Sequence, residues 1–496
     1  MALINARTNT GRAISYESEK FSSGGMKDAH WGHDKTYVVL FYRERPGDEG
    51  MQRLDKIVTT YKESIFDGAG GAYWKQLFNW PTDIVESNGR IGIVAPVYSK
   101  QFFFQYGSKN DDMLGIRGRE KEGKWFASAS HRKSYLDDRE LGDWRSYFRL
   151  CILISRAVKR LHSSGLAHSD LSYKNVLIDP SGGHAMVIDI DSLVVPGVFP
   201  PDVVGTPDFI APEVMATKHL TLKDSKRIVP SIATDKHALA VLIYMYLLYR
   251  HPLRGRKIHD EDPVRDEELA MGERALFIEH PTDESNRVDP ADVRPAALPW
   301  GDPRRMPYTV TGPYLSKLFE RAFIDDLNHP HRRPSADEWN TALVKTLDLM
   351  QPCMNPGCKQ KWFVFDNSTK PKCPFCNTPY TKQLPVLNLY SARMEGQYRP
   401  DNHRIMVYDK QYFYKWHMSR NYFPNARLAD ADKRPVGYFA FHQNKWLLIN
   451  QSMPDLKDIT NDKPVAIGEA VELTDGAQIL FSKKSGGRMA VVQLVN

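Results

Sequence analysis

A short polar loop and the hairpin after it place the strongest constraint on the fold and chemistry of this chain. Residues 168–175 read His-Ser-Asp-Leu-Ser-Tyr-Lys-Asn, and Asp189 follows Asn175 by fourteen positions, at the end of an apolar run. The carboxylate of Asp170, an amide five residues later and a carboxylate on the next hairpin can converge on one divalent ion, since Mg²⁺ favours hard oxygen ligands. The alternative is an ordinary polar loop in which Asp170 caps a turn and Asn175 opens a strand.

Further landmarks follow this loop in a fixed order. Gly205-Thr206-Pro207 leads to the tripeptide Ala211-Pro212-Glu213, and residues 332–339 read Arg-Arg-Pro-Ser-Ala-Asp-Glu-Trp. The stretch from Thr234 to Leu248 is apolar almost all round, which predicts a helix buried in a large core. As an ordered set over residues 20–345, these motifs resemble those of the eukaryotic-type protein kinases.

The resemblance implies a role for each matched residue of the site. Asp170 is expected to position the acceptor hydroxyl, and Asn175 and Asp189 are expected to bind Mg²⁺ beside ATP. The hinge between the two lobes falls near residues 95–98, so Ala95 and Val97 are candidate adenine-binding residues.

The resemblance also predicts structural contacts and a preference among acceptors. Asp235 should accept hydrogen bonds from the backbone of the catalytic loop, and Arg333 should pair with Glu213. Thr206 favours serine or threonine acceptors over tyrosine. Asp191 stands where a glycine would complete the metal-binding turn; its carboxylate either adds a metal ligand or is solvated beside the turn, and we favour the second.

The N-terminal region departs from the kinase pattern. A typical kinase has its phosphate-binding lysine on the third strand, but the matching run here ends in Phe41. Upstream, residues 22–30 resemble a glycine-rich loop with Lys27 at the third glycine. This is similar to the with-no-lysine kinases, in which a lysine at that position replaces the strand lysine. Lys27, with Gly24 and Gly25, is therefore predicted to hold the phosphates.

The sequence does not decide two features of this region: the cation that holds the phosphates and the acid that orients it. Lys35 or Arg43 could point inward in place of Lys27, or no cation could, which would leave a nucleotide-binding pseudokinase. The acid that orients the lysine in ordinary kinases should lie on the helical stretch 53–65. Asp55 and Glu63 both lie there, and their spacing does not choose between them.

Composition bounds the class of protein. At 496 residues and 42% hydrophobic, the chain can form two or three cores. The net charge of +7 arises from 67 basic and 60 acidic residues, so no concentrated nucleic-acid footprint is expected. Residues 1–12 lack the features of a secretory signal, and no run of eighteen apolar residues occurs. We therefore expect a cytoplasmic protein without nucleic-acid or membrane partners.

The cysteines are concentrated in one stretch. Four of the five fall within 24 positions: Cys353, Cys358, Cys373 and Cys376. Two pairs on opposed turns match a zinc ribbon, in which Zn²⁺ folds a small module that lacks its own core. The alternatives are unrelated reduced cysteines or two disulfides, which a cytoplasmic location disfavours. Cys151 lies in a helical run and is expected to be an inert core residue.

After the cysteines the pattern changes to short alternating runs. Residues 386–496 alternate apolar and polar positions between Gly, Asn and Asp, which predicts a β-sandwich. Part of it resembles the second half of a forkhead-associated domain, in which Arg434 and Ser452 would contact phosphothreonine. Val436 replaces the customary histidine. The alternative is a sandwich that is structural or docks other partners.

Together these observations predict an α+β chain with a bilobal kinase fold. The expected boundaries are 15–350 for the kinase domain (N-lobe about 15–98, C-lobe about 99–350), 351–384 for the zinc ribbon and 386–496 for the sandwich. This order resembles bacterial kinases grouped with a phosphatase and a von Willebrand-type protein in tellurite-resistance-associated triads. The resemblance implies a serine/threonine kinase that uses ATP, Mg²⁺ and structural Zn²⁺ and acts on protein substrates. A pseudokinase scaffold is the alternative.

Overall fold

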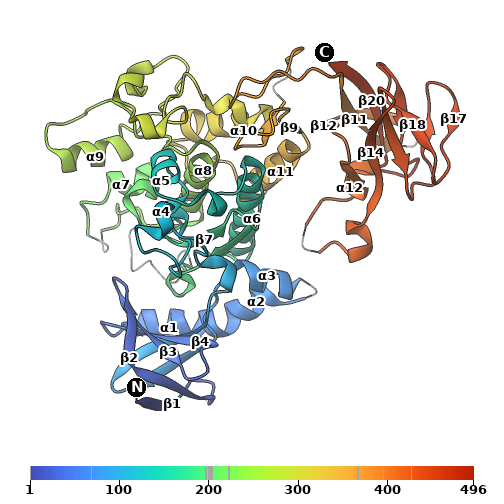
Figure 1. Ribbon diagram of the computed structural model, residues 1–496. Coiled ribbons are helices and arrows are strands. Elements are labelled where there is room, and N and C mark those ends of the chain that lie inside the picture. The colour runs from blue at the N-terminus through green and yellow to red at the C-terminus, as the bar shows by residue number, and fades with distance from the viewer. Residues whose placement is uncertain are drawn as a thin grey trace. The chain divides into compact units, whose positions relative to one another are not determined.

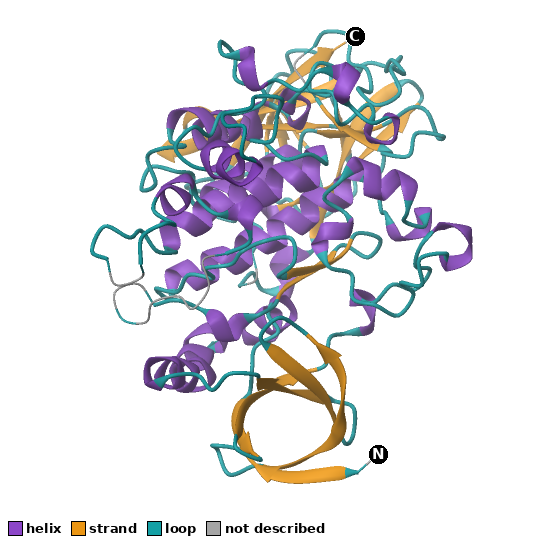
Figure 2. Ribbon diagram, turned by 90° about the vertical axis from the view of Figure 1, so that its left-hand side faces the viewer, coloured by secondary structure: helices purple, strands orange, loops and turns teal. Residues whose placement is uncertain are grey.

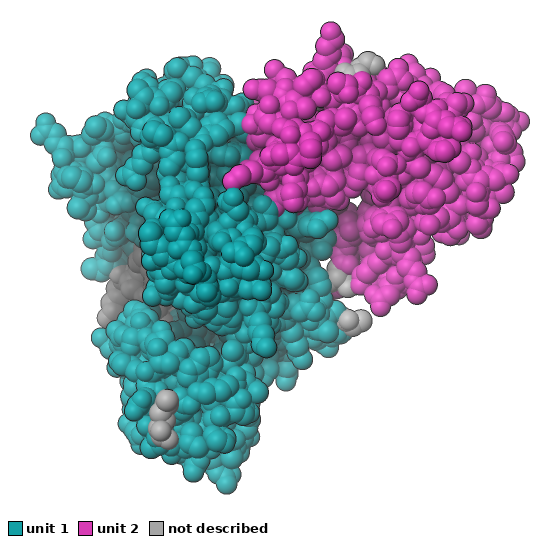
Figure 3. All heavy atoms as spheres, viewed as in Figure 1, with its two compact units in different colours: residues 1–142, 146–308, 317–340 teal, residues 143–145, 309–316, 341–496 magenta. Residues whose placement is uncertain are grey.

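The chain folds into two compact units. The computed structural model describes residues 2–68, 70–195, 198, 205–221, 224–365, 368–394, 396–425 and 427–495. Unit 1 comprises residues 1–142, 146–308 and 317–340, and unit 2 comprises residues 143–145, 309–316 and 341–496; Figure 3 colours them separately. The predicted segment between Asp189 and Glu213 lies partly outside the described residues.

Unit 1 begins with an antiparallel sheet that curves into a nearly closed ring (Figure 2). Its strands, in spatial order, are β1 (Leu3–Arg7), β2 (Ala13–Ser23), β3 (Lys27–Gly32), β4 (Tyr37–Tyr42), β6 (Arg90–Pro96) and β5 (Asp83–Ser87). Successive side chains of a strand point to opposite faces. In β4, Tyr37, Val39 and Phe41 pack into the core inside the ring, whereas Leu40 and Tyr42 face the helix that follows.

That helix is α1 (Asp48–Lys56), which continues through a π-helical turn (Ile57–Tyr61) into α2 (Lys62–Phe66). Its buried Leu54 and Val58 pack on Ile91 and Ile93 of β6. Asp48 and Glu49 lie in the first turn, where acidic side chains interact favourably with the helix dipole. The predicted helical stretch 53–65 is therefore present.

The rest of unit 1 is mainly helical (Figure 1). Its helices are α3 (Gly71–Leu77), α4 (Lys109–Asp112), α5 (Ala129–Ser134), α7 (Pro212–Ala216), α8 (Ile232–Leu248) and α9 (Pro263–Met271); α6 (Trp144–Ser163), α10 (Pro313–Glu320) and α11 (Ala336–Leu347) contain residues of both units. Ser231 and Thr234 form a capping box at the start of α8, and this helix is buried as predicted. Among the described helices, none has the length and apolar character needed to cross a membrane.

Unit 2 is mostly β, as the alternating pattern predicts. A hairpin of β9 (Met350–Pro352) and β10 (Trp362–Val364) precedes two antiparallel sheets. The first contains β11 (Leu384–Met394), β12 (Gln397–Met406), β16 (Lys457–Asp458), β17 (Lys463–Pro464), β19 (Gln478–Leu480) and β20 (Arg488–Val495); the second contains β13 (Tyr412–Tyr414), β14 (Pro435–His442), β15 (Lys445–Asn450) and β18 (Ala470–Glu472). A short helix, α12 (Lys415–Met418), follows β13. Side chains from both sheets share one hydrophobic core.

The predicted ion pair between Arg333 and Glu213 is confirmed. Arg333 donates from Nη1 to Glu213 Oε1 (2.9 Å) and from Nη2 to Oε2 (2.7 Å), and its side chain is 1% exposed. Nη2 also donates to the Leu327 carbonyl (2.6 Å). The guanidinium therefore ties the start of α7 to the loop before α11.

Glu213→Gln should lower the free energy of unfolding by about 3–5 kcal/mol, because it leaves the buried charge of Arg333 uncompensated. Denaturant unfolding followed by tryptophan fluorescence measures the change. The control is Asp337→Asn, which removes an exposed ion pair with Lys159 and should cost less than about 1 kcal/mol. Equal losses in the two variants would contradict a structural role for the buried pair.

Candidate active site

One hairpin brings Asn175 and Asp189 together. β7 (Val176–Asp179) begins directly after Asn175, and β8 (His184–Val187) ends two residues before Asp189. Val176 pairs with Val187, and the backbone N–H of Ile188 donates to the Asn175 carbonyl (3.0 Å). Asp189 has a left-handed backbone (φ 60°), a conformation that Asp tolerates better than most residues.

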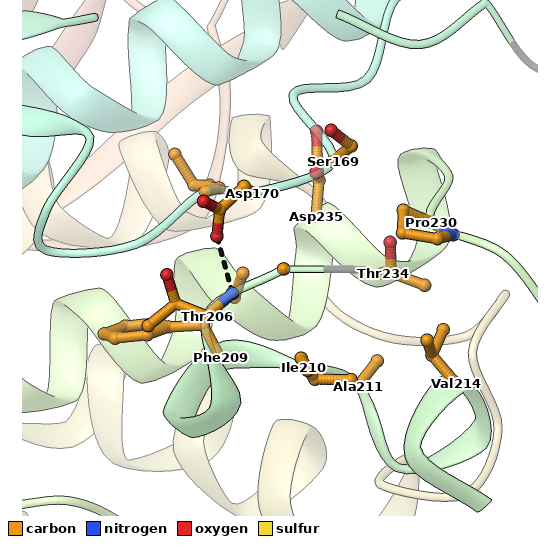
Figure 4. Close-up of a pocket in the computed structure, with 13 residues that line it drawn as sticks. Ser169, Asp170, Thr206, Phe209, Ile210, Ala211, Val214, Pro230, Thr234 and Asp235 are labelled. Atoms are coloured by element: carbon orange, nitrogen blue, oxygen red, sulfur yellow. Dashed lines mark hydrogen bonds between the residues drawn. The ribbon is translucent and has the colours of Figure 1, made fainter. Parts of the chain in front are cut away.

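Asp170 lies against Asn175 and the loop at Thr206. Asn175 Nδ2 donates to Asp170 Oδ2 (2.9 Å) and to its carbonyl (2.8 Å). The backbone N–H of Thr206 donates to Asp170 Oδ1 (2.6 Å), the contact drawn in Figure 4. Asp170, Thr206 and Phe209 also line a narrow pocket, together with Thr234 and Asp235 of α8 (Figure 4). Both oxygens of this carboxylate are therefore held in place by donors.

A buried acid fixes the loop that carries Asp170. Asp235 Oδ2, at the start of α8, accepts from the backbone N–H of His168 (2.7 Å) and from His162 Nε2 (3.1 Å). His168 Nε2 donates in turn to the Ile188 carbonyl (2.9 Å). The predicted contact between Asp235 and the loop backbone is thus confirmed, and it links the loop to the turn before Asp189.

Lys27 forms ion pairs with Asp189 and Asp191, the two acids of the turn after β8. Its Nζ donates to Asp189 Oδ1 (2.8 Å) and to both oxygens of Asp191 (2.8 and 2.7 Å). Burial lowers the pKa of Lys27, but the two carboxylates more than offset this effect and hold the pKa above its usual value. Tyr42 also donates its hydroxyl to Asp191. The expectation of a solvated Asp191 was wrong: its side chain is 6% exposed because Lys27 and Tyr42 enclose it.

These residues face a cavity of about 310 Å³. Its described lining includes Gly24, Gly25, Met26, Lys27, Leu40, Tyr42, Arg53, Asn79, Pro81, Ile93, Ala95, Tyr98, Asn175 and residues 188–192. Lys27, Ala95, Asn175 and Asp189 thus share one cavity. Val97 is outside this lining, and its backbone N–H donates to the Thr36 carbonyl (3.1 Å).

The two other candidate cations have partners elsewhere. Lys35 pairs with Glu17 of β2, and Arg43 pairs with Asp28 (3.3 Å). Neither lines the described part of the cavity.

The register of β4 shows that the lysine missing from the kinase pattern would lie at the position of Tyr42 and not at that of Phe41. Phe41 points into the core inside the ring, so a lysine there would not reach the cavity. The next residue, Tyr42, faces the cavity, because side chains alternate along a strand.

The expected acid on the helix is also absent from the described lining. Asp55 and Glu63 are both exposed, whereas Arg53 of α1 is buried and lines the cavity. The sequence contained the signal: Arg53 precedes Ile57 by one helical turn and so lies on the apolar face.

The four clustered cysteines lie close enough to bind one metal ion. Their sulfur atoms all lie within 4.8 Å of one another, with Cys353 and Cys376 3.5 Å apart and Cys358 and Cys373 3.9 Å apart. These distances exceed a disulfide bond and are close to about 3.8 Å, the edge of a tetrahedron with Zn–S bonds of about 2.3 Å. The donor set therefore fits Zn²⁺.

The two candidate phosphopeptide residues are exposed in unit 2. Arg434 directly precedes β14, and Ser452 follows β15. The backbone N–H of Ser452 donates to the Val436 carbonyl (3.1 Å), which places the two segments side by side.

The region that contains Asp170 matches a known protein family. Residues 124–339 match the protein kinase domain. The match includes Asp170, Asn175 and Asp189 and begins beyond the strand sheet that carries Lys27. A protein kinase domain implies ATP and Mg²⁺.

Two kinases are similar to parts of the chain. Protein kinase C-like 2 of Schizosaccharomyces pombe is 28% identical over 189 residues, which cover 36% of this chain and 16% of that protein. Death-associated protein kinase dapk-1 of Caenorhabditis elegans is 34% identical over 102 residues, which cover 20% of this chain and 6% of that protein. The matches therefore support kinase function for the shared domain and span a small part of either relative.

Proposed function

We propose that this chain is an ATP-dependent serine/threonine protein kinase that transfers the γ-phosphoryl group to protein hydroxyls, including its own. The observation that carries the proposal is the convergence of Lys27, Asn175 and Asp189 on one cavity of about 310 Å³, with Asp170 hydrogen-bonded to Asn175 beside it. Positioned charges of this kind account for most of the catalysis in phosphoryl transfer.

Each residue would have one task. The turn at Gly24 and Gly25, with Lys27, would hold the phosphates, and Ala95 would lie against adenine. Asn175 and Asp189 would hold Mg²⁺, which supplies charge that neutralises the phosphates. Asp170 would orient the acceptor hydroxyl and accept its proton. Thr206 beside Asp170 supports the choice of serine and threonine acceptors.

Incubation of the purified full chain with γ-labelled ATP and Mg²⁺ tests this proposal. We expect wild type to label itself or a generic acceptor protein on serine and threonine, and EDTA to abolish the label. Lys27→Met should reduce the initial rate about 100-fold or more, because a positioned charge on the phosphates is lost. The matched control is Lys35→Met, since Lys35 pairs with Glu17 away from the cavity.

Two outcomes would count against the proposal in different ways. Wild type that binds ATP but transfers no label would support the alternative, a pseudokinase scaffold. Equal rates for Lys27→Met and wild type would remove the role of Lys27 and leave the kinase activity standing.

For unit 2 we propose a zinc ribbon followed by a partner-binding β-sandwich similar to a forkhead-associated domain. The spacing of the four sulfurs supports the first, and the exposed Arg434 and Ser452 on adjacent segments support phosphothreonine binding by the second. The order of domains supports a cytoplasmic bacterial kinase whose partners include a phosphatase and a von Willebrand-type protein.

A further inference from the structure

The loop between α7 and α8, residues 217–231, contains a buried positive charge. Arg227 in this loop is 9% exposed, whereas the next residue, Ile228, is 41% exposed. An exposed isoleucine is common on a protein surface, but an arginine is almost never fully buried unless an anion pairs with it. The burial of Arg227 therefore raises the question of its partner.

The guanidinium of Arg227 has no partner in the part of the chain that the structure describes. Its Nε and Nη1 are buried and make no hydrogen bond there. Asp224, three residues earlier, accepts instead from the backbone N–H of Lys226 (2.8 Å). Glu213 of α7 and Asp235 of α8, the acids of the two helices that the loop joins, have the partners given above. Because an unpaired buried cation costs free energy, Arg227 calls for an anion that the described residues do not supply.

The loop is held next to the site where an acceptor would lie. The backbone N–H of Ile228 donates to Oγ1 of Thr217, which directly follows α7 (3.0 Å). Pro230, three residues after Arg227, lines the pocket that contains Asp170 (Figure 4). Since three residues span at most about 11 Å, Arg227 lies near the region that a protein acceptor must occupy to reach Asp170.

We propose that Arg227 binds the carboxylate of an aspartate or glutamate in the protein substrate, within a few residues of the acceptor, and so selects acidic segments. This inference rests on the proposed function, which identifies the partner as a substrate. A guanidinium can donate two parallel hydrogen bonds to one carboxylate. The exposed side chain of Ile228 would give the same segment an apolar contact beside this charge.

Titration with peptides tests this preference without catalysis. The probes are fluorescent peptides in which one serine is flanked by neutral residues and one aspartate is moved through the positions around it; each has a twin with asparagine at the same position. For at least one position, wild type should bind the aspartate peptide about tenfold or more tightly than its twin, the usual effect of hydrogen bonds to a charged group. Arg227→Met should abolish this ratio, and Arg227→Lys should recover part of it. Fluorescence anisotropy with the full chain measures the dissociation constants.

Lys226→Met is the matched control, because Lys226 is an exposed cation next to Arg227. It should retain the wild-type ratio. Melting temperatures separate recognition from a purely structural role: Arg227→Met should melt at or above the wild-type temperature, because it removes an unpaired buried charge. A structural arginine would show the opposite, a lower melting temperature with an unchanged ratio. Arg227→Gln replaces Arg227→Met if the latter does not fold.

Wild type that binds every aspartate peptide and its twin equally, or binds none of them, would overturn the inference. An Arg227→Met variant that keeps the preference would do the same. Transfer from γ-labelled ATP to the same peptides is scored separately: a preference in binding without transfer refutes the kinase activity, whereas transfer without a preference for the acid refutes only the role of Arg227.

Discussion

Asp170→Asn is expected to reduce phosphoryl transfer by about 10²–10⁴-fold, the usual range for loss of a positioned general base. The carboxylate can accept a proton from the acceptor hydroxyl, and an amide cannot. Its two oxygens are held by Asn175 Nδ2 (2.9 Å) and by the backbone N–H of Thr206 (2.6 Å), so its position beside the cavity is defined before any acceptor binds. Initial rates with labelled ATP measure the loss.

The same two contacts show which control this variant needs. An amide at position 170 would present its NH₂ group to one of two donors, so a local shift of the Thr206 loop could also slow transfer. Titration with ATP separates the effects: unchanged ATP affinity and melting temperature with a lost rate would locate the defect in the chemistry. Asp138→Asn, on the surface of the same unit, should retain full activity. Transfer by Asp170→Asn at the wild-type rate would exclude Asp170 as the base.

Removing zinc is expected to unfold the cysteine module. The hydrophobic cluster here consists largely of the cysteines themselves, with Phe363 and Phe375. Such a module has little apolar area to bury, and structural Zn²⁺ contributes about 10–16 kcal/mol to the folding of comparable peptides. Cys373→Ser should therefore lose the metal and expose the segment between β9 and β11 to proteases.

Metal analysis and limited proteolysis check this prediction. Wild type and Cys151→Ala should each contain about one zinc per chain, because Cys151 is buried in α6 away from the cluster. Cys373→Ser should contain little zinc and be cut rapidly near residue 365. Wild type with far less than one zinc per chain would refute the metal site.

The sequence predicted the parts of the site that local chemistry determines. The spacing of Asp170, Asn175 and Asp189 reflects one loop and one hairpin, and the structure brings these residues together. The buried helix α8 follows from its apolar sequence alone. The ion pair of Arg333 with Glu213 was expected from ordered motifs and is present.

The charges contributed by α1 and by the turn of Asp189 and Asp191 depend on tertiary packing. An acid was expected on the helix because ordinary kinases have one, and this expectation obscured the pattern that places Arg53 on the apolar face. The burial of Asp191 depends on Lys27 and Tyr42, which are more than a hundred residues away in the chain. The spacing of residues around Asp191 did not indicate these two partners.

The attachment of Lys27 to Asp189 and Asp191 has a consequence for control of the protein. Many kinases are regulated by the position of the helix that α1 resembles, whose acid must reach the strand lysine before the site is complete. Here the lysine is anchored to Asp189 and Asp191, so an outward swing of α1 would withdraw Arg53 and leave Lys27 where it is. A ligand that holds α1 outward is therefore expected to leave the contacts of Lys27 with Asp189 and Asp191 intact.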